Sequence, residues 1–221
     1  MERKFNFSPG EYYHIYQRGN NKNLIFLNDR DYRRFSILLY TANGTKTIQL
    51  SDHPRLDRFE LFNLDRGESL VEIGAYCLMP NHFHLLVREK KEGGISSLMH
   101  RVNTSYSMYH NKKYGQTGSP LEKPFKAKHV DDDNYLKYLF AYIHLNPIKI
   151  TDPEGWGGKR ISDPSRAKIF LDHYPYSSYL LYGGENLQEN KIINKNAFPE
   201  YFGETKDFED FIQDWINSSE V

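Results

Sequence analysis

One stretch near the centre of the chain, residues 76–87, most constrains how this sequence can fold. After Pro80 it alternates histidine with apolar residues, which is typical of a strand with a proline at its edge. Successive strand side chains point to opposite faces, so His82 and His84 share one face while Phe83 lies on the other. Two imidazoles about 6–7 Å apart on a strand are suited to bind one metal ion. The pair is equally typical of two half-exposed strand residues, so the interpretation depends on a second segment.

That second segment, residues 135–147, has the pattern of an amphipathic helix. Its apolar residues repeat at i, i+3, i+4 and i+7, acidic residues 131–133 favour a helix start, and Pro147 ends it. Tyr142 and Asn146 are four residues apart and therefore lie on one flank of the helix. Facing the two histidines, a phenol and a carboxamide there would be a nucleophile and a third metal ligand. Taken singly, such residues are more often a core-edge tyrosine and a helix C-cap.

Together, the two motifs resemble those of the HUH single-tyrosine transposases, named for histidine, hydrophobic residue, histidine. The sequence Tyr-Cys-Leu-Met-Pro-Asn-His-Phe-His-Leu-Leu at 76–86 and the sequence Tyr-Ile-His-Leu-Asn-Pro at 142–147 carry the resemblance. The most similar branch is the REP-associated tyrosine transposases and their insertion-sequence relatives. Residues 14–20, His-Ile-Tyr-Gln-Arg-Gly-Asn, and 175–179, Pro-Tyr-Ser-Ser-Tyr, agree with it. The resemblance covers roughly residues 10–182.

This resemblance implies a specific chemistry. A divalent ion, Mg²⁺ or Mn²⁺, would be held by His82, His84 and Asn146, and Tyr142 would attack a DNA phosphodiester to leave a 5′-phosphotyrosine link. The partner would be single-stranded or hairpin DNA, and the reaction would be cleavage and rejoining of single strands by a transposase. The alternative is a catalytically silent DNA-binding protein that keeps the transposase fold. Whether the chain is a monomer or a homodimer stays open.

Charge is distributed unevenly, although the formal net charge is zero. Residues 101–130 are basic with Glu122 as the single acidic residue, and the segment after 199 is acidic. For contact with nucleic acid, the distribution of charged side chains matters more than the net charge. The alternative interpretation of these two segments is that each forms an ordinary solvated face. The predicted DNA-contacting residues are basic side chains of the middle of the chain: Arg101, Lys112, Lys113, Lys123, Lys126, Lys128 and Lys149.

The interleaved strand and helix patterns favour an α+β fold, a mainly antiparallel sheet with helices packed on it. Strands are predicted at 11–19, 59–64, 71–78, 82–89 and 124–130, helices at 29–40, 95–114, 135–146 and 205–217, and irregular segments at 41–58 and 151–168. Asp29 is expected to cap the first helix, and the strands at 71–78 and 82–89 are expected to be antiparallel neighbours in the sheet centre. The resemblance specifies a ferredoxin-like or RRM-like palm. We expect a catalytic domain at 1–150 and a C-terminal extension at 151–221, packed on it or appended to it.

Composition and two rival motif families narrow the remaining choices. The single cysteine, Cys77, excludes an intrachain disulfide, and the sequence has neither a signal peptide nor a membrane-length apolar run, so a cytoplasmic protein without membrane contact is expected. A 2H phosphoesterase needs two His-x-Ser/Thr motifs, which are absent from the sequence. A cupin-type site pairs His-x-His with a glutamate, but the glycine spacing fails and the predicted helix content is too high.

Overall fold

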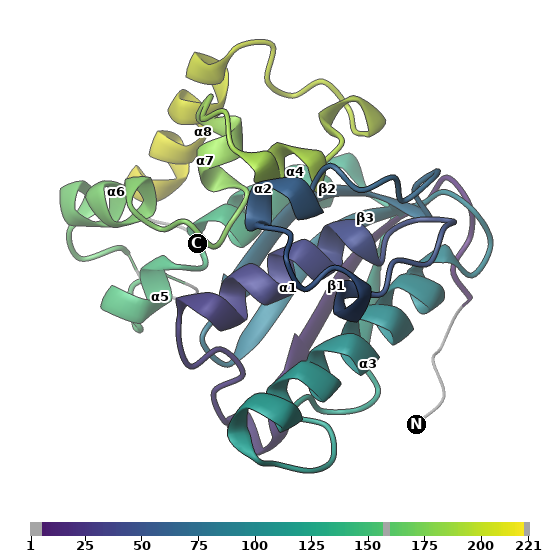
Figure 1. Ribbon diagram of the computed structural model, residues 1–221. Helices are drawn as coiled ribbons and strands as arrows, with labels where there is room; N and C mark the ends of the chain where they lie inside the picture. Colours follow the sequence, from purple (N-terminus) through teal and green to yellow (C-terminus); the bar gives the residue numbers. More distant parts are fainter. Residues whose placement is uncertain (1–5, 157–159, 219–221) are drawn as a thin grey trace.

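The computed structural model describes residues 6–156 and 160–218 and shows a four-stranded antiparallel sheet of order β2-β3-β1-β4, with helices on both faces (Figure 1). The predicted α+β class is confirmed. The strands are β1 Tyr12–Arg18, β2 Val71–Met79, β3 His82–Glu89 and β4 Lys126–Val130. The helices are α1 Asp29–Thr41, α2 Arg58–Leu61, α3 Gly94–Tyr114, α4 Asp133–Leu145, α5 Ile148–Thr151, α6 Pro164–Asp172, α7 Tyr179–Tyr182 and α8 Thr205–Asn217.

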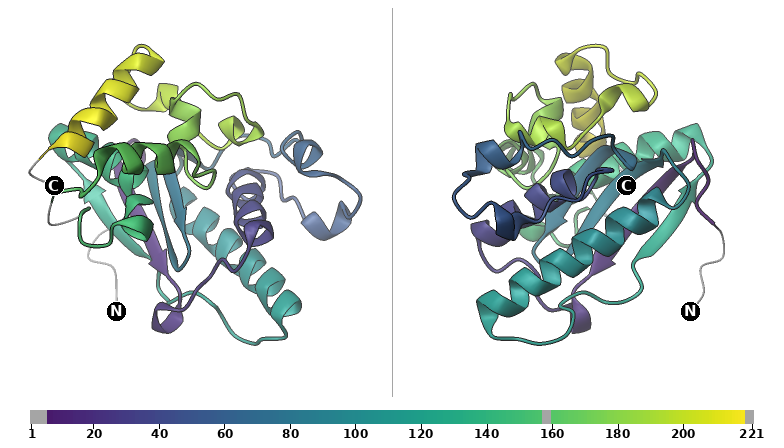
Figure 2. Two further views of the ribbon diagram at one scale, coloured as in Figure 1. Left: turned by 90° about the vertical axis from the view of Figure 1, so that its left-hand side faces the viewer. Right: turned by 45° about the vertical axis from the view of Figure 1, so that its right-hand side comes forward.

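Alternate side chains of β3 point into two different hydrophobic cores, one on each face of the sheet. Phe83 and Leu85 pack into a core with α1 and α3 on one face of the sheet. Leu86 belongs to a second core with α4, α6 and α8 on the other face. Figure 2 shows the sheet lying between these two layers. His82 and His84 share the side of Leu86, because side chains two apart on a strand lie on one face.

The C-terminal segment completes the second core and covers one edge of the sheet. Leu171 of α6 and Phe208 of α8 are buried there against α4. The outer edge of β2 exchanges backbone hydrogen bonds with residues 176–178. Leu78 N donates to Tyr176 O, and Ser178 N donates to Tyr76 O, each at 2.9 Å. Paired edges do not attract a second strand, so this segment protects β2. At Gly74 of β2 a side chain would collide with the Phe198 ring, which would lie 2.6 Å from a Cβ.

Several predicted details are corrected by the structure. Residues 59–64 are not a strand, because Asp57 and Glu60 form a capping box that starts the short helix α2 there. The predicted irregular segment 151–168 contains the start of α6, where Asp163 accepts from Arg166 N. Helix α1 is capped by Asn28 and not by Asp29.

β3 is central, as predicted, but its partner β2 lies at the edge of the sheet. Within the described ranges, no helix has both the length and the apolar character needed to cross a membrane.

Candidate functional site

The two histidines of the central motif lie at the start of β3 with their rings perpendicular and 5.0 Å apart between centroids. His82 Nδ1 is 2.6 Å from the side-chain oxygen of Asn81, and His84 Nδ1 is 2.9 Å from Nε2 of His14 on β1. Both contacts engage Nδ1, so Nε2 of each ring is the atom suited to ligate a metal. This is the arrangement expected of metal-binding histidines, whose second nitrogen is held by a neighbouring group.

Burial keeps these imidazoles neutral. The pKa of His82 is lowered to about 4, mainly by burial and to a smaller extent by the positive charges of Arg18 and Lys149. The pKa of His84 is held well below its usual value, first by burial and then by its histidine neighbours. Neutral imidazole is the form that binds a metal, so neither ring needs to lose a proton first at neutral pH.

Asn146 follows α4 directly and is fully buried. Its Nδ2 donates to the backbone oxygen of Tyr142 at 3.0 Å, and its side chain also interacts with His82. Its Oδ1 is buried and has no hydrogen-bond partner among the described residues. A buried polar atom without a partner requires an explanation, and an amide oxygen on a side chain that interacts with the neutral imidazole of His82 fits a divalent cation.

No group of three or more His, Cys, Asp and Glu side chains in the described part of the chain could hold a metal ion. A cation at the histidine pair would therefore depend on the oxygen of Asn146 as its third protein ligand. Imidazole nitrogen is a better ligand for Mn²⁺ than for Mg²⁺, which prefers an all-oxygen shell, so the donor set favours Mn²⁺ of the two predicted ions.

Tyr142 projects from α4 toward the same histidines. The rings of Tyr142 and His84 form a T-shaped pair with 5.3 Å between their centroids. Lys149 Nζ lies 4.8 Å from the centre of the Tyr142 ring. These groups share a cavity of about 270 Å³. The cavity is lined by Tyr16, Gln17, Arg18, His82, His84, Glu122, Pro124, Lys126, Tyr142 and Lys149. The phenol of Tyr142, two neutral imidazoles and the side chains of Lys126 and Lys149 thus face one space.

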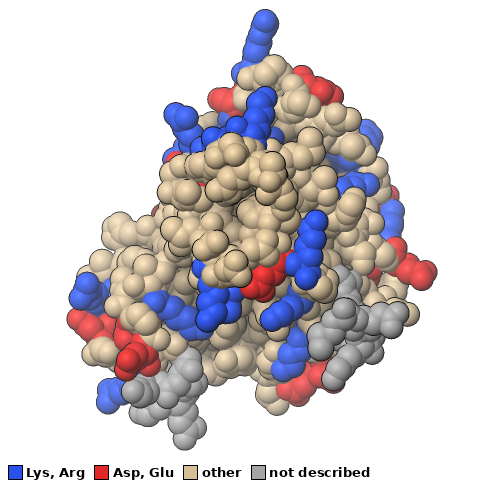
Figure 3. Space-filling view, turned by 90° about the horizontal axis from the view of Figure 1, so that it is seen from below, with Lys and Arg blue, Asp and Glu red and all other residues tan. Residues whose placement is uncertain are grey.

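The predicted basic residues divide between the two faces of the sheet. Lys126 and Lys149 line the site cavity, and the charge of Lys128 acts on His14. The others lie on α3 or in the loop after it. Arg101 donates to the backbone oxygen of Gly44 at 2.7 Å and lines, with Lys112, a groove bordered by α1 and α3. Lys113 pairs with Asp31 at 2.6 Å, and Lys123 borders a cavity on α3. On the face seen from below in Figure 1, lysines and arginines are spread among uncharged residues with carboxylates between them (Figure 3). The described lysines and arginines therefore form no continuous basic surface on this face.

Sequence reasoning missed part of the cavity lining. Arg18 and Tyr16 of β1 face the site, and Glu122 borders it from the loop before β4. The alternation of His14, Tyr16 and Arg18 was a usable signal, because these residues share one face of β1 and the register pairs Arg18 with His82. Glu122 had no such signal, since its position depends on a loop.

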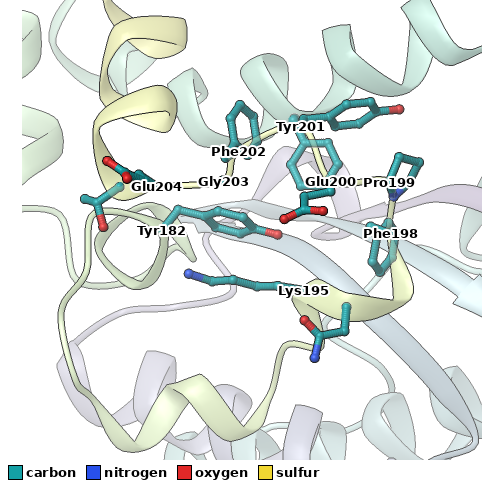
Figure 4. Close-up of a pocket in the computed structure, with 12 residues that line it drawn as sticks. Tyr182, Lys195, Phe198, Pro199, Glu200, Tyr201, Phe202, Gly203 and Glu204 are labelled. Atoms are coloured by element: carbon teal, nitrogen blue, oxygen red, sulfur yellow. The ribbon is translucent and has the colours of Figure 1, made fainter.

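Another cavity, of about 560 Å³, lies between α4 and the C-terminal segment, and five of its twelve lining residues are aromatic (Figure 4). Tyr182 and Lys195 stand together in it, with Lys195 Nζ 4.5 Å from the centre of the Tyr182 ring. It shares no lining residue with the histidine cavity and contains neither a histidine nor Tyr142. The chemistry of the motifs is therefore confined to the smaller cavity.

Comparison with known proteins supports the resemblance that the two motifs carry. Residues 55–146, which include both histidines, Tyr142 and Asn146, match the family model of IS200-like transposases. The predicted resemblance to the single-tyrosine transposases is confirmed. The fold is similar to that of a REP-associated tyrosine transposase solved bound to a REP hairpin, with 14% identity and a TM-score of 0.51. That match covers 86% of this chain and 90% of the other. No curated protein matches the chain.

Proposed function

We propose that this protein cleaves and rejoins single-stranded DNA through a covalent link to Tyr142, and that its substrates carry a hairpin. The observation that carries the proposal is the cavity that Tyr142 and the two neutral histidines line together. The buried side-chain oxygen of Asn146 supports it, because that side chain interacts with His82 and its oxygen has no hydrogen-bond partner among the described residues. The family match supports the reaction class, and the hairpin bound to the similar structure supports the kind of substrate.

In this proposal Tyr142 Oη attacks the phosphorus of one phosphodiester bond. The new bond joins Oη to phosphorus, the bond from phosphorus to the 3′ oxygen breaks, and the phenol proton ends on the released 3′ hydroxyl. Because the phosphodiester energy stays in the phosphotyrosine, a 3′ hydroxyl can reverse the step and rejoin a strand. The ammonium of Lys149, which lies over the Tyr142 ring, would offset negative charge that develops on the phenol oxygen during the attack.

His82, His84 and Asn146 would hold Mg²⁺ or Mn²⁺ at the scissile phosphate. When bound, the ion would polarise the phosphate and offset charge on its oxygens. Arg18 and Lys126, which line the same cavity, would add sequence-independent attraction for the DNA backbone.

The test is formation of a covalent protein–DNA adduct on a denaturing gel, using a library of hairpin-bearing single strands with Mn²⁺. We expect an adduct with the wild type, none after chelation of the metal, and none with Tyr142→Phe, which should keep hairpin affinity within a few-fold. Tyr138→Phe, on the same helix and with its ring retained, is the matched control and should still form the adduct. An adduct that persists in Tyr142→Phe would assign the nucleophile elsewhere, and no adduct with the wild type would favour the silent DNA-binding alternative.

A further inference from the structure

Three tyrosines form one stripe on the outer side of α4. Tyr135, Tyr138 and Tyr142 are spaced i, i+3 and i+7, so they follow one helix face, and each is half-buried. Their rings are nearly parallel: the centroids of Tyr135 and Tyr138 are 6.1 Å apart with planes at 19°, and those of Tyr138 and Tyr142 are 5.8 Å apart at 29°. We call these three residues the tyrosine stripe. Its last member is the proposed nucleophile, so the stripe leads directly into the histidine cavity.

Lysines accompany the stripe along its length. Lys128 Nζ lies 3.9 Å from the centre of the Tyr135 ring, and Lys149 Nζ lies 4.8 Å from that of Tyr142. Lys126 lines the cavity at the Tyr142 end. The register of β1 with β4 pairs His14 with Lys128 and Tyr16 with Lys126, so both lysines stand on the α4 side of the sheet. Lys126 and Lys128 are exposed, which leaves their ammonium groups accessible.

The stripe is bounded on one side and at one end. Trp215 of α8 meets Tyr138 edge-on at 5.7 Å, which closes the side away from β4. Beyond Tyr135 the chain carries the exposed acidic residues 131–133, of which Asp133 is engaged by Lys137. Phosphates would be repelled there. From Tyr142 to Tyr135 the helix rises about 10 Å, at about 1.5 Å per residue, so about three nucleotides fit at the stacked spacing of about 3.4 Å.

We propose that the tyrosine stripe binds the single-stranded flank of the DNA next to the cleaved bond, with bases on the rings and phosphates along Lys126 and Lys128. The inference rests on the proposed function for the position of the cleaved bond. Parallel aromatic rings beside a row of cations are the recurring means of binding single strands, because every base has a π face and an unpaired base exposes it. A duplex keeps its bases paired and stacked, so it would contact the lysines and not the tyrosine rings.

The experiment measures affinity by fluorescence anisotropy for one DNA hairpin that carries flanks of zero to six nucleotides on its 5′ or its 3′ side. We expect the wild type to gain about tenfold in affinity for each of the first two or three nucleotides on one side, and nothing beyond. The variant Tyr135→Leu, Tyr138→Leu should lose that gain and bind the unflanked hairpin normally. The matched control, Tyr135→Phe, Tyr138→Phe, keeps both rings and should keep the gain.

A second measurement needs only the wild type, so it stands even if the leucine variant does not fold. Flanks of abasic residues keep every phosphate and remove every base, and they should give no gain in affinity. Equal gain from abasic and normal flanks, or an unchanged gain in a folded leucine variant, would overturn the inference. Failure of the proposed function has a different signature, since the wild type would then form no covalent adduct whatever its flank affinity.

Discussion

At the scale of single residues, the histidine pair is held by a neighbour outside its own motif. His14 and His84 are 7% and 5% exposed, and the 2.9 Å contact between them can form in only one way when His84 Nε2 binds a metal. In that case Nδ1 of His84 carries the proton and His14 Nε2 must accept it. In that arrangement His14 would position a metal ligand.

We expect His14→Leu to weaken Mn²⁺ binding by about tenfold or more, the usual effect of losing such a support. His14→Gln keeps an acceptor near the same place and should remain within a few-fold of the wild type. Isothermal titration calorimetry checks both, with the double variant His82→Ala, His84→Ala as the reference for lost binding. A His14→Leu protein that binds Mn²⁺ as the wild type does would remove His14 from the metal site.

At the scale of elements, prediction succeeded where a local pattern was complete and failed where long-range contacts decide. The bounds of β3 and α8 were predicted to the residue, because alternation and an amphipathic period extend through each whole element. Residues 59–64 were predicted as a strand from their apolar residues, but the capping box at Asp57 starts a short helix there. The edge position of β2 had no local signal, since it depends on which distant segments pair.

One buried carboxylate links α1 to α3 by hydrogen bonds. Asp31 of α1 accepts hydrogen bonds from Lys113 at 2.6 Å, Tyr114 at 2.7 Å and Tyr109 at 2.9 Å, all on α3. Burial alone would raise the pKa of Asp31, but these bonds together hold it below its usual value. A carboxyl with a lowered folded pKa stabilises the protein above its unfolded pKa of about 3.9, and that contribution is lost as the pH falls below it.

Asp31→Asn should therefore cost about 3 kcal/mol of unfolding free energy at neutral pH, because it removes the charge that pairs with Lys113 and replaces one of the two acceptor oxygens with an amide nitrogen. As the pH is lowered from 5 to 3 the wild type should lose more stability than this variant. Urea denaturation at several pH values checks both expectations. The control is Glu68→Gln, which breaks the exposed pair with Lys91 and should change little. Equal acid sensitivity of wild type and Asp31→Asn would show that Asp31 carries no such linkage.

At the scale of the whole molecule, the expected boundary near residue 150 does not coincide with a gap in the core. Buried side chains on both sides of it, such as Phe140 of α4 and Phe208 of α8, belong to one apolar cluster. The segment after 150 also pairs with the edge of β2. Sequence composition indicated a loop-rich, Pro- and Gly-containing stretch there but could not show what its helices cover. One core predicts one cooperative unfolding unit.

The positions of the two tryptophans make that prediction testable. Trp156 and Trp215 are the only tryptophans of the chain, and both lie after residue 150, whereas most of the backbone that contributes to far-ultraviolet circular dichroism lies before it. Tryptophan fluorescence therefore reports on the C-terminal segment and circular dichroism mainly on the rest. We expect urea transitions followed by the two signals to coincide, and Leu171→Ala, which removes a fully buried side chain of α6, to shift both midpoints together by the equivalent of about 3 kcal/mol. An early fluorescence transition, or a shift confined to fluorescence, would mean that the C-terminal segment unfolds as a separate unit appended to the catalytic part.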